Sequence, residues 1–117
     1  MSSPTQRTLK LLRSYGLHAD VCEKWVPQAK KRRDLFGILD VVAIGVLDRQ
    51  PVTIGVQATS GSNHSSRVKK LIEADTSAPW IAAGNRLQVM SWTKKKNRWH
   101  PRVTELVLNG DGEVVAQ

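Results

Sequence analysis

A single carboxylate lies inside an apolar stretch of the chain. Asp40 interrupts residues 35–46, which read LFGILDVVAIGV. A buried carboxylate without a partner is costly, so such a residue usually has a charged partner, a metal ion or a function. If a two-residue turn is centred on Asp48 and Arg49, Asp40 and Gln57 face each other across an antiparallel hairpin. We therefore expect these two side chains to interact.

A second polar residue belongs to the same predicted cluster. Thr59 lies two residues beyond Gln57 and so shares its face of the strand. A carboxylate with neighbouring oxygen ligands suits Mg²⁺ or Mn²⁺, with water and a substrate phosphate filling the remaining positions. The sequence thus predicts a polar cluster of Asp40, Gln57 and Thr59 that could serve phosphate chemistry.

Two strands and a helix must position this cluster. Residues 35–46 are almost continuously apolar and rich in Val and Ile, which predicts a strand buried on both faces. Residues 52–59, VTIGVQAT, predict the second strand of an antiparallel hairpin. After the polar loop 60–66, the pattern of residues 67–75 predicts a short helix with basic side chains.

Further elements surround this hairpin. Ser3 as N-cap, Pro4 at the first helical position and Gln6 three residues after the cap predict a helix over residues 4–15. Gly16 is suited to end it. The remaining predicted elements are strands at residues 17–26, 79–83, 87–93 and 102–108. This order predicts one α/β domain over residues 1–117, with a mixed central sheet flanked by helices and extra C-terminal strands.

The charge of the chain indicates a polyanionic partner. Eighteen Lys and Arg residues against ten Asp and Glu give a net charge of +8, and the isoelectric point is near 10.2. Such an excess favours nucleic acid. The basic residues are clustered, and those we expect to contact DNA are Lys30, Lys31, Arg32, Arg33, Arg67, Lys70, Lys94, Lys95, Lys96 and Arg98.

Composition excludes several other classes. The chain has 117 residues and one cysteine, Cys22, so it can form neither an intramolecular disulfide nor a Cys-rich zinc site. It contains no GxxxxGK[ST] motif, and we expect no small-molecule cofactor. With no long apolar run and a polar N-terminus, we expect a cytoplasmic protein without a membrane partner.

Two segments resemble a known superfamily. RDLFGILDVVAIG (residues 33–45) and TIGVQATSGSNHSSRVKKL (residues 53–71) resemble the PD-(D/E)XK nucleases. The nearest branch is the Holliday-junction-resolvase-like proteins, which include small phage and bacterial members with Q-x-T in the second motif. The resemblance covers residues 4–84. It implies a restriction-endonuclease-like αβββαβ core and a homodimeric, metal-dependent endonuclease that hydrolyses structured or duplex DNA with weakly bound Mg²⁺ or Mn²⁺.

The family pattern carries over unevenly. Asp40 matches the metal-binding aspartate of the second strand, whereas Gln57 and Thr59 stand where the family has an acidic residue and a lysine. Lys69 or Lys70 could supply the missing positive charge, and Asp34 or Glu23 a second metal-binding carboxylate. The departures favour an alternative: a catalytically impaired nuclease-fold DNA-binding module, or a subunit of a nucleic-acid-processing complex.

Aromatic and histidine residues leave further alternatives open. Trp92 and Trp99 flank a basic run and would either stack on exposed bases or pack against the sheet. Trp25 and Trp80 are predicted core residues. His64 is expected at the start of the helix or in the loop before it, with proton transfer or phosphate contact as the alternative.

Overall fold

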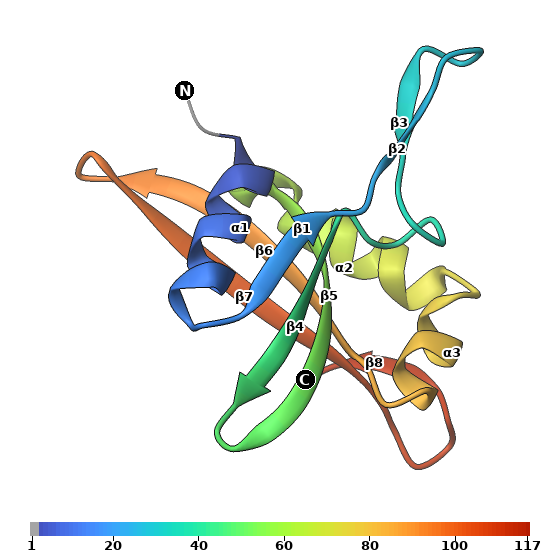
Figure 1. Ribbon diagram of the computed structural model, residues 1–117. Coiled ribbons are helices and arrows are strands. Elements are labelled where there is room, and N and C mark those ends of the chain that lie inside the picture. The colour runs from blue at the N-terminus through green and yellow to red at the C-terminus, as the bar shows by residue number, and fades with distance from the viewer. Residues whose placement is uncertain (1–2) are drawn as a thin grey trace.

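Six strands form one mixed sheet in the computed structural model, which describes residues 3–117 (Figure 1). Across the sheet the order is β1-β4-β5-β6-β7-β8. All neighbouring pairs are antiparallel except β5 and β6, which are parallel. The strands are β1 (His18–Val21), β4 (Val41–Leu47), β5 (Gln50–Ser60), β6 (Arg86–Lys95), β7 (Arg98–Leu108) and β8 (Val114–Ala116). The predicted α/β fold with a mixed central sheet flanked by helices is confirmed, although β8 was not predicted.

Helix α1 (Pro4–Ser14) covers one face of this sheet (Figure 1). The Oγ of Ser3 accepts a hydrogen bond from the backbone N–H of Gln6 at 3.2 Å, which confirms the predicted N-cap. Beyond the helix, Gly16 has φ +85°, a left-handed conformation that glycine adopts without steric cost. The helix buries Leu9 and Leu12 against apolar residues of β4, β5 and β6. Sequence and packing therefore agree over this element.

The opposite face is covered by α2 (His64–Glu73) and α3 (Ser77–Ala82), which follow the short 3-10 turn η1 (Gly61–Asn63). The predicted strand at residues 79–83 is wrong, because most of this segment belongs to α3. Pro79 is tolerated in the first turn of a helix, where its missing N–H leaves no hydrogen bond unmade. The parallel pairing of β5 with β6 also requires a crossover, which α2 and α3 provide. No helix in residues 3–117 is long and apolar enough to cross a membrane.

The predicted strand at residues 35–46 begins only at Val41. Residues before it form a tight turn in which the Leu35 N–H donates to the Leu39 carbonyl at 2.8 Å. Phe36 and Gly37 both have positive φ in this turn. Leu39 is nevertheless fully buried and packs with the side chains under α2 and α3. The apolar run therefore reflects burial, not one continuous extended conformation, and Asp40 lies just before the strand.

The predicted strand at residues 17–26 is divided between two sheets. Its first half is β1, whereas β2 (Lys24–Val26) pairs with β3 (Lys31–Arg33) in a separate two-stranded ribbon. This β2–β3 ribbon, residues 24–33, projects from the body of the molecule (Figure 1). Trp25 lies on it with 55% of its surface exposed, so its prediction as a core residue is wrong. Trp80 is half-buried and packs beside the second core cluster.

Candidate phosphate and metal site

The turn between β4 and β5 sets the position of the central carboxylate. Both turn residues have left-handed φ, +49° at Asp48 and +66° at Arg49, as a tight two-residue hairpin requires. The resulting register pairs Leu47 with Gln50, as predicted, and ends at Val41 opposite Val56. One residue further, the backbone N–H of Asp40 donates to the Val56 carbonyl at 3.1 Å. The regular pairing therefore ends at Val41, and Asp40 meets Gln57 through their side chains just beyond the end of the ladder.

Two carboxylates converge on the amide of Gln57. Its Nε2 donates to Asp40 Oδ2 at 3.3 Å and to Asp34 Oδ2 at 3.1 Å. Asp40 also accepts the backbone N–H of Ala58, at 3.0 Å to Oδ1 and 3.2 Å to Oδ2. The predicted interaction of Asp40 with Gln57 is thus confirmed. Asp34 and Glu23 were the two candidates for a second carboxylate. Of these, Asp34 accepts a hydrogen bond from Gln57.

Helix α2 brings positive charge to the same amide. Lys70 Nζ lies 2.9 Å from Gln57 Oε1 and 3.2 Å from Asp34 Oδ2. Arg67 Nη1 lies 3.5 Å from Gln57 Oε1. These residues are three apart and so project from one side of the helix. Lys69 instead lies 4.0 Å from Glu73 with most of its side chain exposed, so the cluster contains Lys70 and not Lys69.

We refer to Asp34, Asp40, Gln57, Arg67 and Lys70 as the acid–amide cluster. Its electrostatics are dominated by burial, which raises the pKa of Asp40 from 3.8 to about 7. The Ala58 N–H opposes this rise in pKa, the negative charges of Asp34 and Glu23 add to it, and the hydrogen bond from Gln57 opposes it. A positive ion beside Asp40 would favour its charged form.

Cys22 lies next to this acidic environment. Its Sγ is 3.6 Å from the Leu39 carbonyl oxygen. Burial, followed by the charges of Asp40, Asp34 and Glu23, raises the pKa of the thiol to about 11. Because the thiolate is the reactive form, Cys22 is poorly suited to act as a nucleophile.

An electropositive hollow of about 570 Å³ opens beside the acid–amide cluster. It lies between the β2–β3 ribbon and α2. Five of its side chains are cationic and only one is acidic; it is lined by Val26, Lys31, Arg32, Arg33, Asp34, Gly37, Arg67 and Lys70. Such an excess of cations attracts phosphate oxygens.

Oxygen donors for a hard cation are present in this cluster. Asp34 and Asp40 supply carboxylates, and Gln57 an amide oxygen, all ligand types that Mg²⁺ accepts. In residues 3–117 no group of three or more His, Cys, Asp or Glu side chains is arranged to hold a metal ion. The two carboxylates nevertheless converge on one positively polarised group, Nε2 of Gln57, at a position where a cation would have the same electrostatic role.

Three other candidate residues, Thr59, Glu23 and His64, lie outside the acid–amide cluster. Thr59 is buried, but its side chain makes no hydrogen bond to Asp40 or Gln57 in the described part of the chain. Glu23 contributes charge to the environment of Asp40 without a hydrogen bond to it. His64 is the first residue of α2, consistent with its expected place in the chain.

The surroundings of His64 suit a structural role. Its Nδ1 lies 2.6 Å from Ser91 Oγ and its Nε2 lies 2.7 Å from Thr104 Oγ1. Burial, with a smaller effect from Arg102, lowers the pKa of His64. With both ring nitrogens engaged and the side chain 1% exposed, this residue joins α2 to β6 and β7.

The predicted basic run at residues 94–98 forms the tip of the β6–β7 hairpin. Lys94, Lys95, Lys96 and Arg98 are all exposed there. The two tryptophans beside them differ in their surroundings. Trp92 is buried and donates from Nε1 to Thr8 Oγ1 at 3.0 Å, so it packs in the core. Trp99 is partly exposed, and the guanidinium of Arg7 lies 3.3 Å from its ring centroid.

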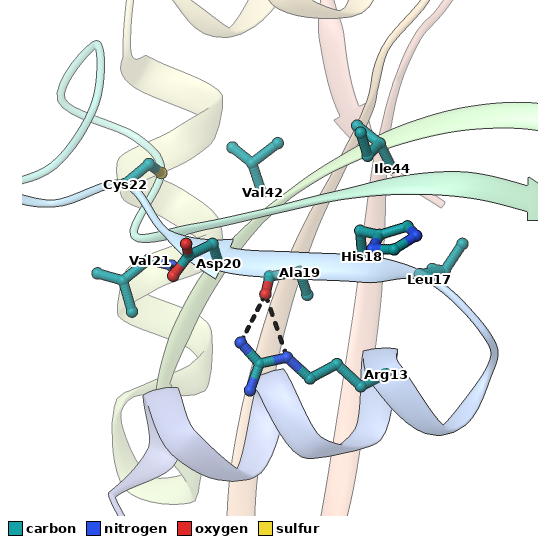
Figure 2. A pocket seen from close by; sticks show the side chains of 9 residues that line it. All are labelled: Arg13, Leu17, His18, Ala19, Asp20, Val21, Cys22, Val42 and Ile44. Carbon is teal, nitrogen blue, oxygen red and sulfur yellow. Dashed lines mark hydrogen bonds between the residues drawn. The ribbon is translucent and has the colours of Figure 1, made fainter.

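A second hollow lies along β1, and its charged groups are already bound to the chain itself. Arg13 donates from Nη2 and Nε to the Ala19 carbonyl at 2.8 and 3.2 Å (Figure 2). The Asp20 carboxylate accepts a hydrogen bond from the backbone N–H of Val21 at 2.8 Å. Because β1 is an edge strand, the Arg13 side chain also blocks a backbone acceptor that another strand would need for pairing. The charged groups of this hollow are therefore less available to a ligand than those of the hollow beside the acid–amide cluster.

The β2–β3 ribbon was missed by the reasoning from sequence. Its only local signals are Pro27 and the dense basic run that follows, and neither indicates a hairpin without a turn motif. Comparison with protein-family models, with curated proteins and with solved structures finds no match.

Proposed function

We propose that the protein is a metal-dependent endonuclease that acts on structured or duplex DNA, of the resolvase-like PD-(D/E)XK type. The main observation that supports this proposal is the acid–amide cluster, which lies next to a hollow lined by five cationic side chains. Carboxylates and cations side by side suit a reaction that must hold a phosphodiester and a metal ion together. Apart from the β2–β3 ribbon, the turn η1 and α3, the elements from α1 to β6 follow the order α1-β1-β4-β5-α2-β6, with β5 and β6 parallel, which is consistent with the αβββαβ core implied by the resemblance.

Each member of the cluster has a role in this proposal. Asp34 and Asp40 would hold Mg²⁺ or Mn²⁺. Gln57 would add its amide oxygen only after the side-chain amide turns over, because Nε2 faces the carboxylates and Oε1 faces Lys70. When bound, the ion supplies a Lewis acid for the phosphate and lowers the pKa of a water molecule. Lys70 carries a positive charge 3.2 Å from Asp34, from where it can contact a phosphate oxygen. The exposed cations around the hollow bind the flanking DNA backbone, and a homodimer would place two such sites on symmetric strands.

A second candidate is supported by the neutralisation within the cluster. Nε2 of Gln57 already binds both carboxylates, and Lys70 pairs with Asp34, so the residues partly compensate one another. Removing negative charge weakens affinity for hard cations. This favours a DNA-binding module, or a subunit of a nucleic-acid-processing complex, that keeps the basic surface without efficient cleavage.

Cleavage assays with matched variants separate the two candidates. Purified protein is incubated with four-way-junction, flap and duplex DNA in Mg²⁺, Mn²⁺ or EDTA. An endonuclease cleaves only with metal and loses that activity in Asp40→Asn. Metal-independent binding without cleavage supports the module instead. The absence of both binding and cleavage would contradict both candidates.

A further inference from the structure

The β2–β3 ribbon is a protruding, strongly cationic element. Residues 24–33, KWVPQAKKRR, carry five positive charges and no acidic residue. In the described part of the chain, no side chain of this segment forms a hydrogen bond or salt bridge. Its charges are therefore available to an external partner. Unpaired cations gathered on one projecting element are typical of a surface that binds phosphates.

The two faces of the ribbon are chemically different. Directly paired residues of antiparallel strands project to the same side. One face thus carries Lys24 with Arg33 and Val26 with Lys31, and it borders the electropositive hollow. The other carries Trp25 with Arg32. Both faces are cationic, so a polyanion that surrounds the ribbon is contacted on both sides.

The tip of the ribbon carries side chains of types that can hydrogen-bond to base edges. The turn is closed by the N–H of Lys30, which donates to the Pro27 carbonyl at 3.2 Å, and Lys30 has φ +50°. Gln28 and Lys30 are exposed at this tip. A glutamine amide can bind N6 and N7 of adenine, and a lysine ammonium can bind O6 and N7 of guanine, in both cases from the major groove.

The dimensions of the ribbon restrict the groove that it fits. Two paired strands lie about 4.8 Å apart, and the three residues of each strand extend roughly 10 Å before the turn. With its side chains such a ribbon fits a B-DNA major groove about 12 Å wide but not a minor groove about 6 Å wide. The major groove of an A-form RNA duplex is too narrow and deep for side chains to read. The geometry therefore favours duplex DNA over duplex RNA.

We propose that the β2–β3 ribbon is an arm that enters the major groove of duplex DNA, with Gln28 and Lys30 at the base edges. This inference rests on the proposed DNA-directed function and adds how the substrate is held. Lys31 and Arg33, on the face beside the hollow, then contact the phosphates of the strand that leads toward the acid–amide cluster. The β6–β7 tip lies at the same end of the sheet, because β6 runs parallel to β5 and extends beyond it. It supplies a second set of backbone contacts.

Guanine methylation tests this arm. A B-form DNA duplex is bound in EDTA, so that it stays intact, and treated with dimethyl sulfate, which modifies guanine N7 in the major groove. We expect wild-type protein to protect guanines within its site and to bind this duplex at least tenfold more tightly than an RNA duplex of the same sequence. The double variant Gln28→Ala/Lys30→Ala should lose the N7 protection. Lys31→Ala/Arg33→Ala should instead lower the salt dependence of binding.

The variants distinguish the possible failures. Arg49→Ala removes one exposed cation from the β4–β5 turn, at the opposite end of these strands, and should leave affinity and protection unchanged. Binding with no N7 protection, protection that survives in Gln28→Ala/Lys30→Ala, or equal affinity for RNA and DNA duplexes would overturn the arm while leaving the proposed function intact. If wild-type protein binds no DNA, the proposed function fails, and the arm fails with it.

Discussion

Replacing Asp40 by Asn should make the protein more stable at alkaline pH but not at acidic pH. In the folded state, burial raises the pKa of Asp40 from its ordinary value of 3.8 to about 7. The native state therefore binds this proton more tightly than the unfolded state does. As a result, the free energy of unfolding of the wild type should fall as the pH rises from about 4 to about 7, and then level off.

The magnitude follows from the two pKa values. One pH unit corresponds to about 1.4 kcal/mol, so a rise from 3.8 to about 7 corresponds to about 4 kcal/mol. Asn keeps one oxygen for the Ala58 N–H, but its NH₂ group would face Nε2 of Gln57. Losing that hydrogen bond costs about 1 kcal/mol. Asp40→Asn should therefore be about 3 kcal/mol more stable than wild type at pH 8 and about 1 kcal/mol less stable near pH 4.

Urea denaturation of both proteins at pH 4.5 and pH 8, in EDTA, measures this difference. Comparing the two proteins cancels the titration of groups that they share. Asp111→Asn, in the exposed β7–β8 turn, serves as the matched control. An Asp40→Asn effect of the same size and sign at pH 4.5 and pH 8 would refute the reasoning, because it would mean that Asp40 is not held in a buried, unfavourable charged state.

Three further outcomes are expected. If the protein cleaves DNA, Lys70→Ala should lower the cleavage rate by about 10²-fold while Lys69→Ala leaves it near wild type, and equal rates for the two variants in a single-turnover assay would contradict the role of Lys70. DNA affinity should fall steeply between about 50 and 200 mM salt, by roughly 0.9 log units per neutralised phosphate for each log unit of salt, and a flat titration would argue against backbone contacts. Gly55→Ala should destabilise the fold by about 1–3 kcal/mol in thermal denaturation, because its Cβ would lie 2.8 Å from Trp80 Cζ2 and crowd Leu39, whereas Gly110→Ala, with nothing within 4 Å, lacks this overlap.

Packing decided which member of each alternative pair belongs to the cluster. Sequence reasoning left Lys69 or Lys70, and Asp34 or Glu23, equally open. The rotation of α2 about its axis turns Lys70 toward Gln57 and leaves Lys69 beside Glu73. Lys70 and Asp34 are 36 positions apart in sequence, so local periodicity contains no information about their 3.2 Å contact.

Apolar runs were informative about burial but not about backbone conformation. Leu39 is buried as its neighbours suggested, yet it belongs to a tight turn and not to a strand. Trp80 lies in a segment predicted as a strand, whereas the parallel pairing of β5 and β6 requires a crossover, of which α3 forms a part. In both segments, long-range packing overrode the local preference of only a few residues.

Local signals by themselves determined the start of α1 and the register of the β4–β5 hairpin. Ser3 caps a helix through contacts within one turn, and a two-residue turn at Asp48 and Arg49 fixes every facing pair up to Val41 and Val56, which brings the next residues, Asp40 and Gln57, into side-chain contact. Only the tertiary structure decided that Asp34 and Lys70 join them, and that the basic run after Pro27 folds into a ribbon beside the same hollow. Caps and tight turns are set by residues close in sequence, whereas a site assembled from a turn, a strand and a helix depends on how those elements pack across the sheet.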